Sequence, residues 1–315
     1  MEMTNDDLLP TLRIGQVELR EAGKEWLIES IWLAGATGII GGQPKLWKSW
    51  MCLEMAVSTA SGTPFLGRFA VKDTGPTLVY MAEDDAADIR KRVDGICTYR
   101  GLDVNTLDLS LITSNRLYLD DEMDREKLRH TIEHVGPKLL VLDPLVRLHR
   151  GNENDSRDIS ALLGFLRELQ RQYGCAVVLA HHANKRSHGR PGQGLRGSSD
   201  LHAFGSSNLY LSHRTDCVEI NVEHRAAAST GPYFVRLVDE GGTHLQMTDP
   251  ATGLSSDAPS LEDRILDHLA HTDQPIARGD LRATLRVNNH RLGKSLTALL
   301  TNGQIVATPD GVAIT

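Results

Sequence analysis

Residues 42–49 read Gly-Gln-Pro-Lys-Leu-Trp-Lys-Ser, and side chains of these types at this spacing can bind the phosphates of a nucleotide. An apolar run precedes them, and a helical pattern follows them. In such a strand–loop–helix, backbone N–H groups face the anions, Lys48 supplies a positive charge and Ser49 supplies an oxygen for Mg²⁺. Trp47 stands where the strict pattern G-x-x-x-x-G-K-[ST] has its second glycine. The residues therefore predict a phosphate site with one altered position, and a glycine-rich turn without a ligand is the alternative.

Three more residues that suit nucleotide chemistry come at the ends of apolar runs. Glu83, Asp143 and His182 each follow or close a run that is typical of a buried strand. Ligands of open α/β sheets bind outside the carboxyl ends of the strands, so we expect these residues to converge with Lys48. We predict a nucleotide-binding set of Gly42, Gln43, Pro44, Lys45, Leu46, Trp47, Lys48, Ser49, Trp50 and Asp143.

Each of the converging side chains has a chemical role and a structural alternative. Glu83 is placed to orient and deprotonate an attacking water, with Asp84 as a fallback, although acids here also suit a helix N-terminus. Asp143, with Ser49, is placed to hold Mg²⁺ through water, although aspartate often ends strands for turn chemistry. His182 is expected to contact the γ-phosphate while its neighbour packs, because adjacent residues of a strand point to opposite sides. A structural histidine pair is the alternative.

A basic, glycine-rich loop over residues 183–199 follows His182 and contains no acidic residue. Its position favours coupling between the nucleotide and a polyanion such as DNA, and a solvated surface loop is the alternative. The formal net charge of −7 gives no global attraction to nucleic acid, so any contact must come from local basic residues. The candidates for nucleic-acid contact are Arg150, Lys185, Arg186, Arg190, Arg196, Arg291 and Lys294.

The elements that must position these residues alternate between strands and helices up to about residue 180. This alternation predicts an α/β fold with a mostly parallel sheet, and the later strands are expected to extend one edge in antiparallel fashion. Residues 249–259 have the composition of a linker. Three short helices and a hairpin within residues 260–315 predict a small winged-helix-like domain behind a main domain of residues 1–248. The absence of a long apolar stretch and the acidic N-terminus favour a cytoplasmic protein without a membrane span.

Taken together, the motifs resemble those of RecA-like P-loop ATPases of the plasmid RepA hexameric-helicase type, which are relatives of DnaB-type helicases. The resemblance covers roughly residues 24–240. It rests on residues 42–50, Glu83, and segments 142–145, 181–185 and 195–199.

This resemblance implies ATP and Mg²⁺ as ligands, with Lys48 and Ser49 as the Walker A pair. It likewise implies that Glu83 is the catalytic glutamate, Asp143 the Walker B aspartate and His182 a γ-phosphate sensor. Arg225 falls where relatives place an arginine finger that reaches the neighbouring subunit. Glu223 replaces the lysine that often stands two residues before that finger, so Arg214 and Arg196 stay as rivals.

An arginine acting between subunits implies a homo-oligomer, and the resemblance favours a hexameric ring around single-stranded DNA. The sequence therefore predicts an Mg²⁺-dependent ATPase, a RepA- or DnaB-like replicative helicase, with replication proteins as further partners of the winged-helix-like domain. Two alternatives stay open: a DNA-binding initiator or regulator in which ATP only controls assembly, and a recombination mediator that forms filaments.

Overall fold

The computed structural model describes residues 11–18, 25–151, 156–182, 199–249, 261–272, 274–285, 289–309 and 311–314. The chain divides into two compact units, Met1–Pro250 and Ala251–Thr315. Within the described ranges, no helix is both long enough and apolar enough to cross a membrane.

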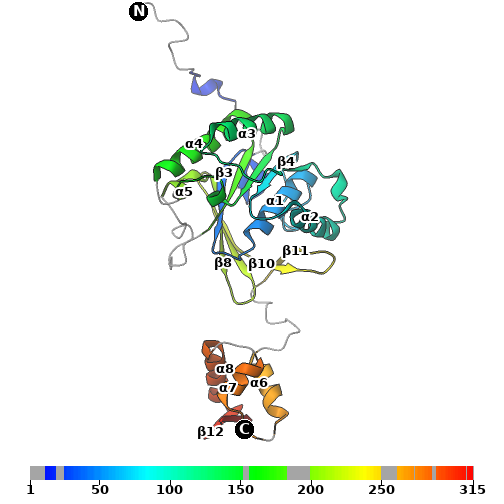
Figure 1. The fold of residues 1–315 in the computed structure, drawn as a ribbon, viewed down its shortest axis with the longest axis vertical. Helices are drawn as coiled ribbons and strands as arrows, with labels where there is room; N and C mark the ends of the chain where they lie inside the picture. The colour runs from blue at the N-terminus through cyan, green and yellow to red at the C-terminus, as the bar shows by residue number, and fades with distance from the viewer. Residues whose placement is uncertain are drawn as a thin grey trace, which may run out of the picture. The chain divides into compact units, whose positions relative to one another are not determined.

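The larger unit is built on a nine-stranded sheet with the order β11-β10-β9-β8-β3-β7-β6-β4-β5 (Figure 1). Strands β5, β4, β6, β7, β3 and β8 pair in parallel, and β8 to β11 pair in antiparallel fashion. The strands are β3 (Thr37–Gly42), β4 (Thr77–Met81), β5 (Leu109–Leu111), β6 (Leu139–Asp143), β7 (Ala176–His182), β8 (Ser207–His213), β9 (Val218–His224), β10 (Thr230–Val238) and β11 (His244–Thr248).

The predicted α/β class with antiparallel edge strands is confirmed, with one correction. The sequence analysis expected all the late strands to be antiparallel, but β8 pairs in parallel with β3, Ile40 lying opposite Leu209. The short helix α5 (Ser199–Phe204) comes before β8. Strand β11 was not predicted, and neither was the small hairpin of β1 (Trp26–Ile28) and β2 (Trp32–Leu33).

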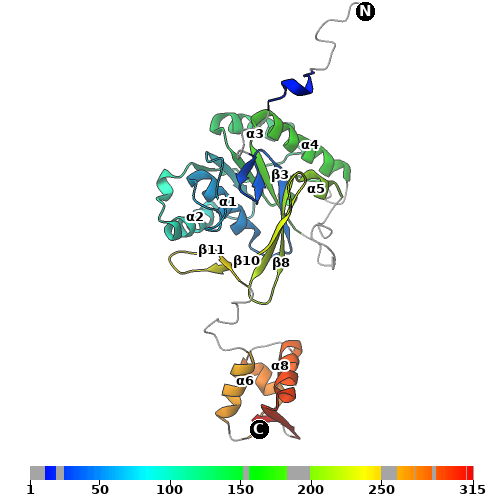
Figure 2. The same cartoon turned by 180° about the vertical axis from the view of Figure 1, so that it is seen from behind.

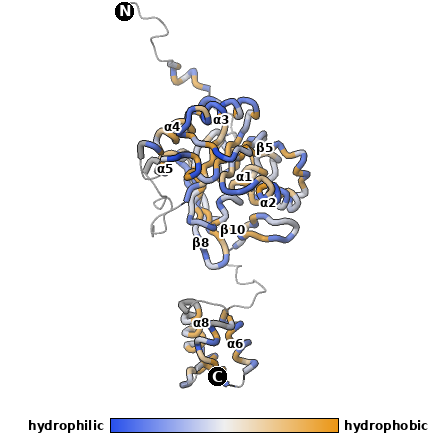
Figure 3. Tube along the Cα trace, in the orientation of Figure 1, coloured by the Kyte–Doolittle hydropathy of each residue, from blue (hydrophilic) through white to orange (hydrophobic). Residues whose placement is uncertain are grey.

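Helices cover both faces of the sheet, as Figures 1 and 2 show. Successive strand residues point to opposite faces, so Ile40 packs in the core beneath α1 (Lys48–Ser61) and α2 (Ala86–Arg100), whereas Ile39 packs in the core on the other face. The second face is covered by α3 (Glu122–Val135), α4 (Ser156–Tyr173) and α5. Burial on both faces explains why the central strands read as continuous apolar runs; they appear largely orange in Figure 3.

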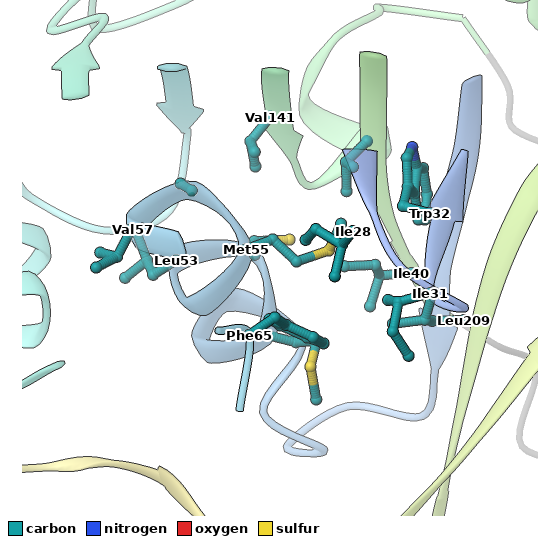
Figure 4. Close-up of a cluster of buried hydrophobic side chains, with 14 of the residues drawn as sticks. Ile28, Ile31, Trp32, Ile40, Leu53, Met55, Val57, Phe65, Val141 and Leu209 are labelled. Atoms are coloured by element: carbon teal, nitrogen blue, oxygen red, sulfur yellow. The ribbon is translucent and has the colours of Figure 1, made fainter. Parts of the chain in front are cut away.

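Helix α1 carries the predicted phosphate-binding residues at its N-terminus and is packed tightly along its length. Figure 4 shows Met55 of α1 close to Ile28 of β1 and Ile40 of β3, with Leu53 and Val57 on the other side of the helix. Such packing fixes the position of the helix N-terminus relative to the ends of the strands.

The antiparallel extension also holds α1 in place. The backbone N–H of Leu245 in β11 donates to Glu54 Oε1 at 2.9 Å, and Glu54 forms a buried ion pair with Arg100 of α2. Gly95 of α2 lies so close to the β10–β11 turn that a Cβ there would be 2.6 Å from the carbonyl oxygen of Thr243. Glycine is therefore needed where the hairpin meets the helix.

In its described residues, the smaller unit contains three helices and a two-stranded hairpin around its own apolar core. A winged-helix identity stays a prediction. Its elements are α6 (Leu261–Ala270), α7 (Arg278–Leu285), α8 (Asn289–Thr301), β12 (Ile305–Thr308) and β13 (Gly311–Ile314).

Candidate functional site

The loop between β3 and α1 brings its cation against its own backbone. Lys48 Nζ donates to the carbonyl oxygens of Gly42 at 3.1 Å and Gln43 at 2.8 Å. A Cβ on Gly42 would lie 2.9 Å from the carbonyl oxygen of Leu211 in β8, so the first glycine is needed for the close approach of two strands. The ammonium group is thus held at the mouth of the loop, where it can exchange carbonyl partners for anionic oxygens.

Trp47 adopts the left-handed conformation that the missing glycine would adopt easily. Its φ is 56° and its ψ is 29°, and Lys45 has a φ of 65° in the same loop. This conformation costs an L-residue roughly 1–2 kcal/mol. The half-buried indole packs against the core beneath α1, as Trp50 does, and also lines the cavity described next. The backbone therefore keeps the loop's shape, but with strain at one position.

A cavity of about 470 Å³ lies at the carboxyl ends of the parallel strands. It brings together four residues that the sequence analysis expected to converge: Lys48, Glu83, Asp143 and His182. Its full lining is Pro44, Lys45, Leu46, Trp47, Lys48, Ser49, Trp50, Glu83, Asp84, Arg92, Asp143, Pro144 and His182.

Convergence follows from the sheet register. Strand β4 lies beside β6 with Met81 opposite Asp143, and the N–H of Ala82 donates to the carbonyl oxygen of Asp143 at 2.8 Å. Glu83 therefore stands two residues beyond the level of Asp143. On the other side of β6, β7 runs in parallel and ends at His182.

Asp143 is buried, with 5% of its surface exposed. Burial raises the pKa of its carboxyl group to about 6, against the lowering effects of a hydrogen bond with Ser49 and the charge of Lys48. The ionised carboxylate thus lacks full compensation within the protein, and a cation would supply it. Carboxylate and hydroxyl oxygens are ligands that Mg²⁺ takes, so Asp143 and Ser49 fit the predicted ion.

Lys48 is the complementary buried charge. Burial lowers the pKa of its ammonium group, and the nearby carboxylate of Asp143 opposes that change. Both members of the pair are therefore destabilised by burial in their charged forms. Phosphate oxygens and a divalent cation together would compensate both charges.

Glu83 lies at the exposed rim of the cavity and is engaged by a residue that the sequence analysis did not single out. Arg147 Nε donates to Glu83 Oε1 at 2.9 Å. Asp85, and not Glu83, is the acid that caps α2, accepting from the N–H groups of Ala87 and Asp88.

Arg92 of α2 also lines the cavity and was missed. It forms two hydrogen bonds to Asp84, of 2.8 and 2.7 Å, and its guanidinium group lies 5.8 Å from the centre of the Trp50 ring. Helical spacing contained a signal, since Arg92 stands three residues after Ile89 and four before Ile96, both of which are buried. This spacing places Arg92 beside the buried face of the helix.

The two adjacent histidines separate as predicted from strand geometry. His181 is buried, and His182 lines the cavity. Among the residues whose placement is described, no group of three or more histidine, cysteine, aspartate or glutamate side chains is arranged to hold a metal.

Two of the arginine-finger candidates, Arg225 and Arg214, contact other groups of their own chain, and the third, Arg196, lies outside the described residues. Arg225, directly after β9, donates through a side-chain nitrogen to the carbonyl oxygen of Ala203. Arg214 pairs with the buried carboxylate of Glu219. Neither residue lines the cavity.

The nucleic-acid candidates fall into three groups. Arg150 is engaged by Asp120 at 3.4 Å and Asp121 at 3.5 Å, and lies over the ring of Tyr118. The side chains of Arg291 and Lys294, both in α8, are not described. Outside the described residues lie Lys185, Arg186, Arg190 and Arg196.

A parallel sheet with a loop–helix phosphate site and carboxylates at adjacent strand ends defines a P-loop nucleotide-binding fold. A family described as "AAA domain" matches residues 7–188, which is more than half of the chain. The chain belongs to this AAA-domain family.

Solved structures with a similar fold include that of a DnaB-like replicative helicase, described together with its interactions with primase. It has 15% sequence identity and a TM-score of 0.52 over 67% of this chain, and the match spans 57% of the helicase chain. A KaiC-like protein of Pyrococcus horikoshii OT3 has 14% identity and a TM-score of 0.49, over 71% of this chain and 94% of its own. The expected RecA-like fold is confirmed.

Proposed function

We propose that this protein is an oligomeric, Mg²⁺-dependent ATPase that acts on DNA, and that it is a replicative helicase of the RepA or DnaB type. One observation carries the proposal: Lys48, Ser49, Glu83, Asp143 and His182 border a single cavity at the carboxyl ends of the parallel strands. Two further observations support the helicase assignment: the resemblance of the motifs, and the fold shared with a DnaB-like helicase.

The reaction that suits this cavity is hydrolysis of ATP by in-line attack of water on the γ-phosphorus. Glu83 orients the water and takes its proton as the new phosphorus–oxygen bond forms and the bond to the β–γ bridging oxygen breaks. Lys48 offsets the negative charge on the phosphates, and His182 contacts the γ-phosphate. Mg²⁺, held through Ser49 and Asp143, would supply further charge compensation at the phosphate oxygens.

Arg225 is the favoured finger residue for a neighbouring subunit. Withdrawing Arg214 from Glu219 would leave a buried carboxylate without its cation, which is costly. Arg225 loses only a bond to a backbone carbonyl when it moves. An arginine finger contributes roughly 10³–10⁵ in rate, so ring assembly and turnover should depend on each other.

Strand displacement on a forked DNA duplex tests the helicase assignment. The full chain should separate the strands only with hydrolysable ATP and Mg²⁺, and negative-stain microscopy should show rings. ATP hydrolysis without strand displacement would remove the helicase assignment but keep the ATPase.

The strain at Trp47 favours a second candidate, an initiator or regulator in which ATP controls assembly and turnover is slow. Such a protein would bind DNA in an ATP-dependent manner without unwinding it. Filaments on single-stranded DNA, in place of rings, would instead indicate the recombination mediator.

A further inference from the structure

Arg147 occupies a position that joins the rim of the nucleotide cavity to the protein surface. It ends the short helix η4 (Leu145–Arg147), which begins two residues after Asp143. Its Nε–H donates to Glu83 Oε1 at 2.9 Å, and Arg147 itself does not line the cavity. The side chain therefore contacts the proposed general base from outside the site.

The turn that carries Arg147 is rigid. Leu145 and Leu148 are fully buried in the core beneath α3 and α4, and the N–H of Leu119 donates to the carbonyl oxygen of Leu148. Arg147, in contrast, keeps 60% of its side chain exposed. An arginine on an anchored turn holds its partner in a defined place, as precise sites require.

Only part of the guanidinium group is used. Within the described part of the chain, the side chain of Arg147 makes one hydrogen bond, from Nε, so its Nη1 and Nη2 groups keep their donors. Arg150, three residues on, differs because it is engaged by two carboxylates and lies over an aromatic ring. Arg147 is accordingly the less engaged of the two arginines, and both of its Nη groups have donors for a second anion.

A planar guanidinium group has five N–H donors in a fixed fork and can contact two anions at once. One edge, through Nε, fixes Glu83 Oε1 and leaves Oε2 to accept from water. The Nη1 and Nη2 groups are left for a second partner, and a guanidinium group binds phosphate oxygens through such donors.

We propose that Arg147 is a positioning residue for Glu83 and also a phosphate contact for single-stranded DNA. A bound backbone phosphate immobilises the guanidinium group, which in turn holds the Glu83 carboxylate in the orientation that receives the proton from water. This inference rests on the proposed function, which assigns Glu83 as the base. It explains how bound DNA would change the rate of ATP hydrolysis.

The strength of the ion pair limits its effect without DNA. Glu83 and Arg147 are 46% and 60% exposed, and an exposed pair of this kind changes an equilibrium by a factor of about five at most. The Arg147→Ala protein should therefore keep DNA-free hydrolysis within about fivefold of the wild type. Its main defect should be in the response to DNA.

The test measures steady-state ATP hydrolysis by the full chain, with and without saturating single-stranded oligothymidylate. Fluorescence anisotropy with labelled oligothymidylate establishes saturation for each variant. In Arg147→Ala we expect kcat with DNA to equal kcat without it, whereas KM for ATP stays within about twofold, because Arg147 is outside the cavity. Arg90→Ala is the matched control, because Arg90 is an exposed arginine of the same unit that pairs with Asp94, and it should keep the wild-type stimulation factor. Arg147→Lys keeps the charge but lacks the fork, so it should bind the oligonucleotide without restoring stimulation.

Two results would overturn the inference. Normal stimulation of Arg147→Ala by DNA would show that Glu83 is positioned by other means, and DNA-free activity above the wild type would show that Arg147 restrains Glu83. A wild-type protein that hydrolyses ATP without any response to DNA would refute this inference alone. A wild-type protein without ATPase activity would refute the proposed function as well.

Discussion

Two pairs of opposite charges lie at the same edge of the sheet, and they differ in burial. Lys48 and Asp143 are each 5% exposed, and burial shifts the pKa of both groups toward their neutral forms. Glu83 and Arg147 form a hydrogen-bonded pair that is about half exposed, a class that contributes only about 0–1 kcal/mol. The buried pair therefore costs free energy that a ligand can recover by binding, whereas the exposed pair can change partners at little cost.

The largest expected effect comes from removing the buried cation. Lys48→Ala should lower kcat for ATP by at least about 10²–10³-fold, the range seen when one preorganised donor to a developing charge is lost. Steady-state hydrolysis measures this. Lys72→Ala is a matched control, because Lys72 is an exposed lysine of the same unit paired with Glu29. Equal activity in the two variants would remove the distinction between the buried and exposed charges.

Asp143→Asn tests the cost of the buried carboxylate. A pKa raised from 3.8 to about 6 means that the folded protein binds the proton more tightly than the unfolded chain, so ionisation destabilises the fold as pH rises through this window. The substitution should raise the free energy of unfolding without ligands by about 3 kcal/mol at pH 8, and by about half of that at pH 5.

Urea unfolding at the two pH values measures this gain. A gain independent of pH would mean that the substitution acts through packing. Loss of stability at pH 8 would show that the carboxylate of Asp143 is already compensated within the protein.

Much of the candidate site could be predicted from the sequence, because its residues stand at the ends of predicted strands. Apolar runs that alternate with helices require a parallel sheet, and a parallel sheet brings the residues after its strands to one edge. Lys48, Glu83, Asp143 and His182 were placed by that reasoning alone. The need for a left-handed residue at Trp47 followed from the glycine that it replaces.

The partners of those residues could not be predicted in the same way. Arg147 reaches Glu83 only because β4 and β6 are neighbours in register, although the two residues are 64 positions apart. Arg92 depends on the rotation of α2 about its axis. Strand β8 was expected to be antiparallel because the late strands are joined by short turns, and the helix α5 before it follows a glycine-rich run without apolar periodicity. Strand β11 was missed, although its Leu245 holds the buried Glu54.

A smaller effect is expected at Trp47, which belongs to the loop that positions the buried Lys48. Trp47→Gly removes the left-handed strain of roughly 1–2 kcal/mol, so kcat should rise by about five- to thirtyfold if the strain is relieved between the ground and transition states. Steady-state kinetics checks the rate, and light scattering checks the assembly. Loss of assembly without a rise in kcat would identify Trp47 as a residue between subunits.

The central claim is that this cavity hydrolyses ATP with Glu83 as the base, and the Glu83→Gln protein tests it most directly. Glutamine keeps the shape of the side chain but cannot take a proton from water. The measurement compares ATP binding, by equilibrium titration with a fluorescent ATP analogue, with single-turnover hydrolysis in the same preparation. We predict wild-type affinity within about threefold and a hydrolysis rate lowered by about 10²–10⁴-fold. Hydrolysis at the wild-type rate with intact binding would contradict the account.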